Sequence, residues 1–222
     1  NGKAFAAKLS KDLVKAGYVT VSGLARGIDS AVHSSSLGNT IAVIAGGIDH
    51  IYPPENKTLY EEIAKNGLLL AELPIGCKPL SQHFPQRNRI ISGLALATVV
   101  IEAGMKSGSL ITANLAVEQN RDVFAVPGFP LDPRCMGSNQ LIKNGAYLLE
   151  SVEDILINVV SKEKFQKELE EKASYFNNMS LYMGNNSNLQ VTDKNRAAVI
   201  QLLSASEVTF EVVAQQLQLE LP

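Results

Sequence analysis

The sequence has few cysteines and lacks a long hydrophobic segment. Its two cysteines, Cys77 and Cys135, lie far apart and show no C-x-x-C spacing. A zinc site or a disulfide framework is therefore not expected, and a reducing compartment fits. No apolar run approaches the roughly 18 residues that span a bilayer, and no basic-then-apolar secretion signal begins the chain. These absences favour a cytoplasmic protein without a membrane segment.

Two common nucleotide-binding motifs are also missing. The segment SGLARGID (residues 22–29) has the glycine spacing G-x-x-x-G instead of G-x-G-x-x-G, and no P-loop is present, which disfavours NAD-binding proteins and P-loop NTPases. His33, His50 and His83 do not have metal-ligand spacing, and no serine lies in a G-x-S-x-G elbow. We therefore expect no metal, no cofactor and no catalytic residue.

The charge is small and unevenly distributed. The formal net charge is −2, but residues 1–150 carry 14 basic and 12 acidic side chains, while residues 151–222 carry 6 and 10. Any nucleic-acid site must therefore be a local basic patch on the first part of the chain.

Short apolar runs alternate with helical patterns over residues 1–150. The runs are rich in Val, Ile and Leu, as expected for strands that are buried on both faces. Alternation at this spacing predicts an α/β domain, with a parallel sheet covered by helices on both faces. The predicted strands are residues 18–22, 40–45, 68–71, 98–101 and 123–126, and the predicted helices are residues 3–16, 26–37, 57–66, 87–97 and 109–120.

The remaining residues differ in composition. Residues 151–174 have the pattern of a charged amphipathic helix, and residues 177–188 are rich in Asn, Ser and Gly, as in a linker. Two short helical patterns follow, at residues 195–203 and 210–217, and resemble the first half of a helix-turn-helix. We therefore divide the chain into residues 1–150, a helix and linker at 151–190, and the start of a small helical domain at 191–222.

Small residues gather in the loops that follow the predicted strands. The carboxyl ends of parallel strands share one edge of a sheet, where ligands of open α/β folds bind. Backbone N–H groups in such loops suit phosphate oxygens, although glycines are also routine in tight turns and Ser107 or Ser109 could simply cap a helix. The residues best suited to phosphate are Ser22, Gly23, Gly46, Gly47, Ser107 and Ser109.

The segment FPQRNRIISG (residues 84–93) combines an aromatic ring with two arginines at the expected start of a helix. Helical phase places Arg87 on the side of the apolar residues and Arg89 on the opposite side. We therefore expect Arg87 to organise a pocket, or to form a buried ion pair, and Arg89 to face outward. Phe84 offers a surface for base stacking, and Glu72 and Glu102, at strand ends, could act as acids or anchor loops.

Several long motifs occur in order and resemble the bacterial DNA-processing protein A family, also called DprA or Smf. They cover residues 1–150 densely, and residues 195–222 resemble the start of the family's winged-helix domain. The motifs are SGLARGID at 22–29, residues 40–47 with Tyr52, Pro53 and Asn56, FPQRNRIISG at 84–93, Glu102, SGSLITA at 107–113, VFAVPG at 123–128, and Gly137 to Ala146.

The resemblance implies an extended Rossmann-like fold that binds single-stranded DNA without strong sequence preference. It further implies a homodimer that protects incoming strands during natural transformation and loads the RecA recombinase, without catalytic turnover. The family's DNA pocket corresponds here to Arg26, Phe84, Arg87, Asn88, Lys106 and the Gly108 loop.

The chain departs from the family pattern in three places. The family's opening strand, with its Gly-Ser-Arg loop, is expected before Asn1, so we expect that the sequence is a fragment. Residues 119–121 read Gln-Asn-Arg where the family usually has Gln-Gly-Arg, and the winged helix stops before its recognition helix.

The sequence is also compatible with two other functions. One is a Rossmann-like hydrolase of nucleoside monophosphates, which would use the same loops with Glu102 and Glu118. The segment Ala103–Ser109 does not match the Pro-Gly-Gly-x-Gly-Thr-x-x-Glu sequence of those enzymes, which disfavours this alternative. The other is a protein-interaction module formed by residues 151–222.

Overall fold

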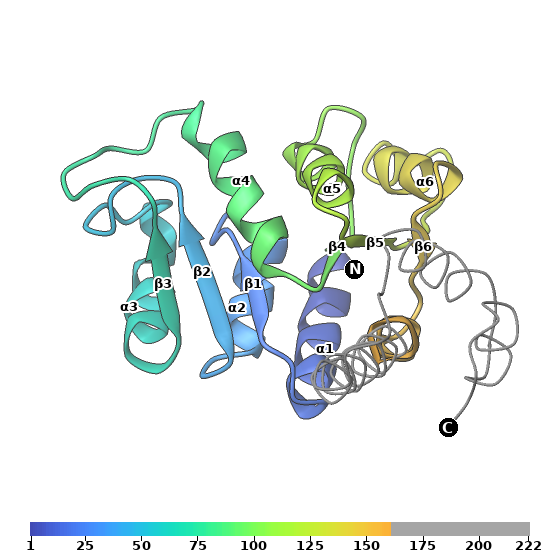
Figure 1. Ribbon diagram of the computed structural model, residues 1–222, viewed down its shortest axis with the longest axis horizontal. Helices are drawn as coiled ribbons and strands as arrows, with labels where there is room; N and C mark the ends of the chain where they lie inside the picture. The colour runs from blue at the N-terminus through green and yellow to red at the C-terminus, as the bar shows by residue number, and fades with distance from the viewer. Residues whose placement is uncertain (161–222) are drawn as a thin grey trace, which may run out of the picture. The chain divides into compact units, whose positions relative to one another are not determined.

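The computed structural model describes residues 1–160, and its strands form two parallel sheets (Figure 1). Strand order is β1-β2-β3 in the first sheet and β4-β5-β6 in the second. Parallel pairing confirms the predicted α/β class, whereas the single expected sheet is divided into two ladders of three strands. The strands are β1 (Thr20–Ser22), β2 (Thr40–Ile44), β3 (Leu68–Ala71), β4 (Ala97–Val100), β5 (Asp122–Ala125) and β6 (Tyr147–Leu148).

Helices occur where the sequence pattern predicts them, with differences at their ends. Helix α2 begins at Ile28 instead of residue 26, because Leu24 and Gly27 adopt positive φ angles of 58° and 96° in the turn before it. Helix α4 begins at His83, so Phe84 lies in its first turn. The helices are α1 (Gly2–Lys15), α2 (Ile28–Ser35), the 3-10 helix η1 (Pro54–Asn56), α3 (Lys57–Asn66), α4 (His83–Leu94), α5 (Gly108–Glu118) and α6 (Met136–Lys143).

The sequence pattern gave less information about the elements that follow β5. Helix α6 and strand β6 were not predicted, and residues 152–160 are helical, as expected for the start of the charged helix. The predicted linker and the helices from residue 195 lie outside the described residues. Within residues 1–160, no helix has both the length and the apolar character needed to cross a membrane.

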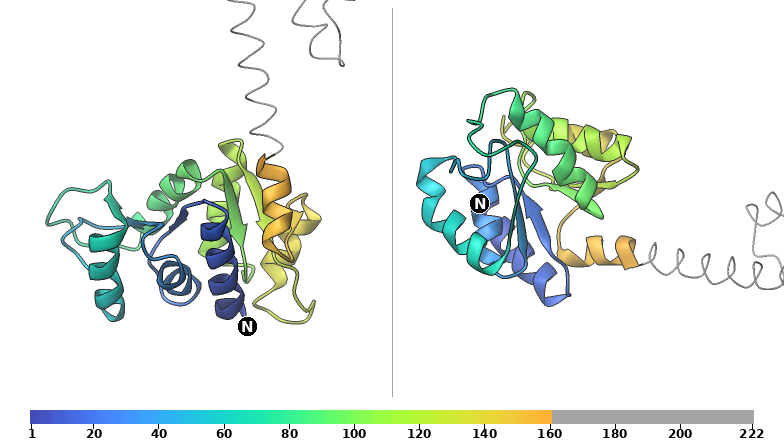
Figure 2. Two further views of the ribbon diagram at one scale, coloured as in Figure 1. Left: turned by 90° about the horizontal axis from the view of Figure 1, so that it is seen from below. Right: turned by 60° about the vertical axis from the view of Figure 1, so that its left-hand side comes forward.

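The helices cover the sheets on both sides. Figure 2 shows α1, α2 and α3 on one side of the first sheet and α4 on the other. In the first sheet, Ala42 and Ile44 of β2 pack with Leu59, Tyr60 and Ile63 of α3. The second sheet has a core on each face, one formed with α1 and the helix at 152–160, the other with α5 and α6.

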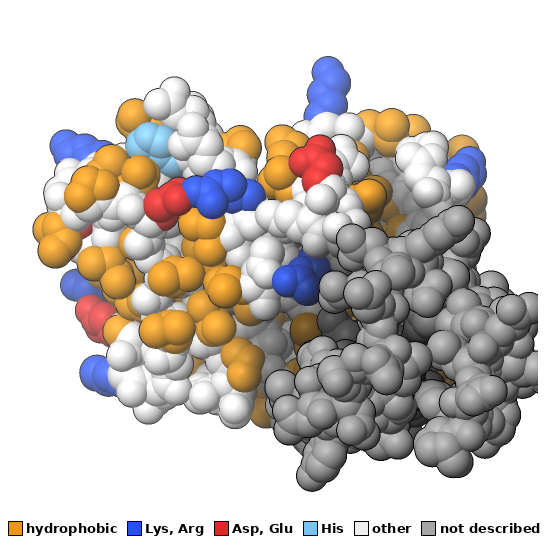
Figure 3. All heavy atoms as spheres, viewed as in Figure 1, with side chains coloured by type: hydrophobic (Ala, Val, Ile, Leu, Met, Phe, Trp, Pro, Cys, Tyr) orange, Lys and Arg blue, Asp and Glu red, His pale blue; other side chains and the backbone are white. Residues whose placement is uncertain are grey.

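Cover is incomplete on the face of the first sheet that carries α4. Figure 3 shows hydrophobic side chains gathered there over the strands. Helix α4 contacts β1 and β2, while Leu68 at the start of β3 and Leu94 at the end of α4 are about half exposed.

A buried polar network joins β1, α2 and β2. The Nδ1 atom of His33 lies 2.7 Å from Oγ1 of Thr40, and Thr20 Oγ1 lies 2.8 Å from the same oxygen and 2.7 Å from Oγ of Ser36. All four side chains are buried. Burial lowers the pKa of His33 from 6.5 to about 4, and the charge of Arg87 acts in the same direction. His33 is thus a neutral structural residue at physiological pH.

This burial predicts a specific loss of stability in acid. Between pH 6.5 and about 4 the unfolded chain binds a proton that folded His33 does not, so the free energy of unfolding falls as the pH falls through this window. The contribution of His33 is roughly 3 kcal/mol in total. Urea unfolding of the wild type and of His33→Asn at several pH values measures the difference, and His50→Asn, at a partly exposed site, is the control. An unchanged pH dependence in His33→Asn would contradict this interpretation.

Candidate nucleic-acid interface

Arg87 is a buried arginine that connects α4 to the ends of two strands. Its Nη1 atom donates to the carbonyl oxygen of Gly23, at 2.7 Å, and to that of Val43. Only 7% of the residue is exposed, and burial lowers the pKa of its guanidinium, partly offset by the charge of Asp29. The predicted inward direction of Arg87 is therefore confirmed, but the acceptors are backbone carbonyls and not the carboxylate of an ion pair.

Gly23 makes room for this guanidinium. A Cβ atom at position 23 would lie 2.5 Å from both terminal nitrogens of Arg87, so a side chain there would displace the guanidinium from its two carbonyl acceptors. The glycine that follows β1 thus makes the approach of Arg87 possible, and its carbonyl group is part of the same contact.

Arg89, two residues later, faces outward as predicted. It forms an ion pair with Glu72, and both side chains are about half exposed. The other strand-end acid, Glu102, accepts a hydrogen bond from the backbone N–H of Gly2 at 3.1 Å. Both carboxylates therefore anchor neighbouring segments. Glu102 is the acid that the hydrolase alternative requires, and its carboxylate is bound to the backbone of Gly2.

Two aromatic rings lie in a row between two arginines. The rings of Tyr52 and Phe84 meet edge to face, with centroids 5.4 Å apart. The guanidinium of Arg26 lies 6.0 Å from the Tyr52 centroid, and that of Arg87 lies 5.9 Å from the Phe84 centroid. Distances of this size allow cation–π attraction. Tyr52 was not among the predicted site residues, although it belongs to the motifs that resemble the family.

Arg26 is exposed and held by a carboxylate. Its Nη2 atom donates to Oε1 and Oε2 of Glu55 at 2.8 and 3.0 Å, and its Nε donates to Oε1 at 3.1 Å. Hydrogen bonding with Glu55 raises the pKa of Arg26 and lowers that of Glu55. Glu55 was also missed by sequence reasoning, because 29 residues separate it from Arg26.

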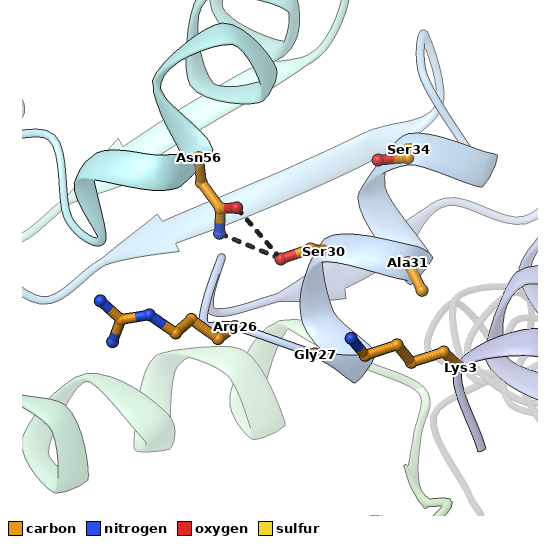
Figure 4. Close-up of a pocket in the computed structure, with 7 residues that line it drawn as sticks. All are labelled: Lys3, Arg26, Gly27, Ser30, Ala31, Ser34 and Asn56. Carbon is orange, nitrogen blue, oxygen red and sulfur yellow. Dashed lines mark hydrogen bonds between the residues drawn. The ribbon is translucent and has the colours of Figure 1, made fainter. Parts of the chain in front are cut away.

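Arg26 borders an open depression of about 390 Å³ at the beginning of α2 (Figure 4). Arg26 and Lys3 lie on either side of Gly27, so two cations flank the first turn of the helix. The depression is lined by Lys3, Arg26, Gly27, Ser30, Ala31, Ser34 and Asn56.

Asn56 holds the turn that presents Arg26. Its Nδ2 atom donates to the carbonyl oxygen of Leu24 at 2.9 Å and to Oγ of Ser30 at 3.0 Å. Ser30 in turn donates to the carbonyl oxygen of Ala25 at 2.7 Å. These bonds support the left-handed conformation of Leu24, which a leucine adopts only at a cost.

The Gly46–Gly47 loop was expected to offer its amides to a phosphate. In the structure it is instead packed against the loop after β3. Both glycines are buried, and Gly47 N–H donates to the carbonyl oxygen of Cys77 at 2.7 Å. A Cβ atom on Gly47 would lie 2.5 Å from the carbonyl oxygen of Pro74. Close backbone packing between the loops after β2 and β3 therefore explains these glycines.

The loop between β4 and α5 is open to solvent. Ser107 caps α5, accepting a hydrogen bond from the N–H of Ser109 at 3.4 Å, and the two hydroxyl oxygens lie 2.7 Å apart. Lys106 and Gly108 are exposed. The helix start beside the Lys106 ammonium retains the character of an anion site, and the capping role of Ser107 is compatible with it.

The site residues thus form two groups, one at the end of each sheet. Arg26, Phe84, Arg87 and Gly23 belong to the first, with Tyr52 and Glu55 added by the structure. Lys106, Ser107, Gly108 and Ser109 form the second. Ser22 and Asn88 are partly exposed. In residues 1–160, no cluster of three or more His, Cys, Asp or Glu side chains could hold a metal ion.

Known proteins are similar to this chain in both sequence and fold. Protein Smf of Synechocystis sp. is 49% identical over 162 residues, covering 72% of this chain and 41% of that protein. The DNA processing protein DprA of Bacillus subtilis is 51% identical over 157 residues, covering 69% of this chain and 53% of its own length. The chain therefore spans about half of the length of these relatives, or less.

Two solved structures are similar as well. DprA from Streptococcus pneumoniae matches with a TM-score of 0.65 and 46% identity, over 70% of this chain and 56% of that chain. DprA from Helicobacter pylori, solved to explain its single-stranded DNA binding mode, matches with a TM-score of 0.68 and 30% identity, over 72% of this chain and 74% of that chain.

The family comparison agrees with the motifs and with the parallel α/β fold. Residues 1–160 match the model of the family described as DNA recombination-mediator protein A. The chain belongs to the DNA recombination-mediator protein A (DprA/Smf) family.

Proposed function

We propose that this protein binds single-stranded DNA at the carboxyl ends of its strands and acts as a recombination mediator. The observation that carries the proposal is the row Arg26–Tyr52–Phe84, which combines an exposed cation with two rings at one edge of the sheet. Stacking surfaces next to cations suit a strand whose bases are unpaired. The H. pylori relative, whose structure was solved for its single-stranded DNA binding mode, supports the same assignment.

The residues have different roles in this proposal. Phe84 stacks on a base, Arg26 and Lys106 contact phosphates, and the Ser107–Gly108 turn and Asn88 supply hydrogen bonds. Arg87 was expected to contact DNA; we propose instead that it holds the loops after β1 and β2 in place, and its burial and its two bonds to backbone carbonyl groups support this role.

The wider role follows from the family. We propose that the protein protects incoming strands in the cytoplasm during natural transformation and loads RecA onto them, as a homodimer and without catalytic turnover. The description of the family as a recombination mediator supports this role. Strand β6 lies at an edge of its sheet, and its Tyr147 and Leu148 are exposed, which suits a contact between two copies.

Lys106→Ala tests the phosphate contacts. We expect weaker binding to mixed-sequence single strands and a salt dependence that is shallower by about 0.7 in the logarithmic slope, the value for one lost contact. Lys65→Ala is the matched control, because Lys65 lies in the last turn of α3, near the start of β3 and away from the carboxyl ends of the strands. Fluorescence anisotropy over a series of salt concentrations measures both quantities. Equal affinity of the wild type for single-stranded and duplex DNA would count against the proposal.

Phe84→Leu tests stacking separately from charge. The substitution keeps an apolar side chain but removes the ring, so affinity for single strands should fall by about 1–3 kcal/mol, while the salt slope stays the same. Phe129→Leu, at an exposed ring in the loop after β5, is the control. If Phe84→Leu binds single strands with wild-type affinity, the proposed stacking role of Phe84 is wrong.

The two neighbouring arginines should differ in their effect on stability. Arg87→Ala leaves two carbonyl groups without their donor and a buried gap, so we expect a loss of roughly 2–4 kcal/mol in the free energy of unfolding. Arg89→Ala removes an exposed ion pair and should cost less than about 1 kcal/mol. Urea unfolding decides, and similar losses in both variants would contradict the assignment.

A further inference from the structure

The contact between Arg26 and Glu55 occupies the cation that the proposed function assigns to a phosphate. Two nitrogens of Arg26 are bound to the carboxylate, through three hydrogen bonds of 2.8–3.1 Å. Both side chains are 61% exposed, so the pair lies at the surface, where a strand of DNA would approach. The fork of the guanidinium is filled by Glu55 in the way in which a phosphate would fill it, because carboxylate and phosphate oxygens present the same bidentate geometry.

Both partners are held in position by their own segments. Glu55 lies in η1, directly before Asn56, whose side chain is bound to the carbonyl oxygen of Leu24 in the turn that precedes Arg26. The ring of Tyr52 also lies against the guanidinium, with its centroid 6.0 Å from the central carbon of Arg26. The bonds of Asn56 hold the loop of Glu55 next to the loop of Arg26. The backbone therefore places the carboxylate and the guanidinium within reach of each other.

We propose that Glu55 is an internal competitor for the DNA phosphate: it binds Arg26 in the free protein and must release it before Arg26 can bind the backbone of a single strand. This inference rests on the proposed function and specifies how that site is regulated. Release of Arg26 leaves the Glu55 carboxylate uncompensated close to DNA, which opposes binding. Glu55 thus lowers the affinity for any strand and weakens the salt dependence that Arg26 would otherwise contribute.

The test is a set of salt-titrated binding curves on a mixed-sequence single-stranded oligonucleotide. The proteins are the full chain and its Glu55→Gln, Arg26→Ala and Arg26→Ala/Glu55→Gln variants. Glu55→Gln keeps the shape of the side chain and removes its charge, so affinity should rise by up to about fivefold, the upper end of the range for an exposed ion pair. The salt slope should become steeper by up to about 0.7. Glu61→Gln, an exposed acid on α3 that lies 4.0 Å from Lys57, is the control for net charge.

The outcomes separate the inference from the function on which it rests. A gain in Glu55→Gln that exceeds the gain in Glu61→Gln and disappears in the double variant supports the proposal. A wild type that binds single strands, together with a Glu55→Gln variant that binds no better than Glu61→Gln, overturns the inference alone. A gain that persists without Arg26 also overturns it, because Glu55 then acts only through its general charge. Lack of binding by the folded wild type overturns both the function and the inference.

Discussion

The arrangement of the first sheet depends on one buried guanidinium. Arg87 reaches from α4 to the carbonyl groups of Gly23 and Val43, and so joins a helix to the carboxyl ends of two adjacent parallel strands. A charged group is costly to bury, and it is retained here where two backbone acceptors converge. The loop after β1, the position of Phe84 and the room left by Gly23 all follow from this contact.

The exposed part of the site is built outward from that anchor. Phe84 lies against the buried guanidinium, Tyr52 lies against Phe84, and Arg26 lies against Tyr52. The row therefore runs from a buried guanidinium to an exposed one. Asn56 and Glu55, from the segment between β2 and α3, keep the outer end in place. Rigid support of this kind is what a binding surface needs to retain its geometry.

Much of the fold could be predicted from the sequence, because short apolar runs alternate with helical patterns over residues 1–150. The phase of residues 84–93 also showed which arginine faces inward. The partners of these residues could not be predicted, because Arg87 and its acceptors are 64 and 44 positions apart and no local pattern connects them. Strand β6 has two residues, too few to show alternation, and the positive φ of Gly27 moved the start of α2.

The burial of Arg87 has a consequence for how the protein responds to its ionic surroundings. Dissolved ions compete for exposed cations such as Arg26 and Lys106 but do not reach a guanidinium enclosed by backbone. Under the proposed function, a rise in salt therefore detaches a bound strand while the loops around Arg87 keep their form. Under the same proposal, capture and release are reversible steps on a preserved backbone, and the protein can bind the next strand as soon as the ions are diluted.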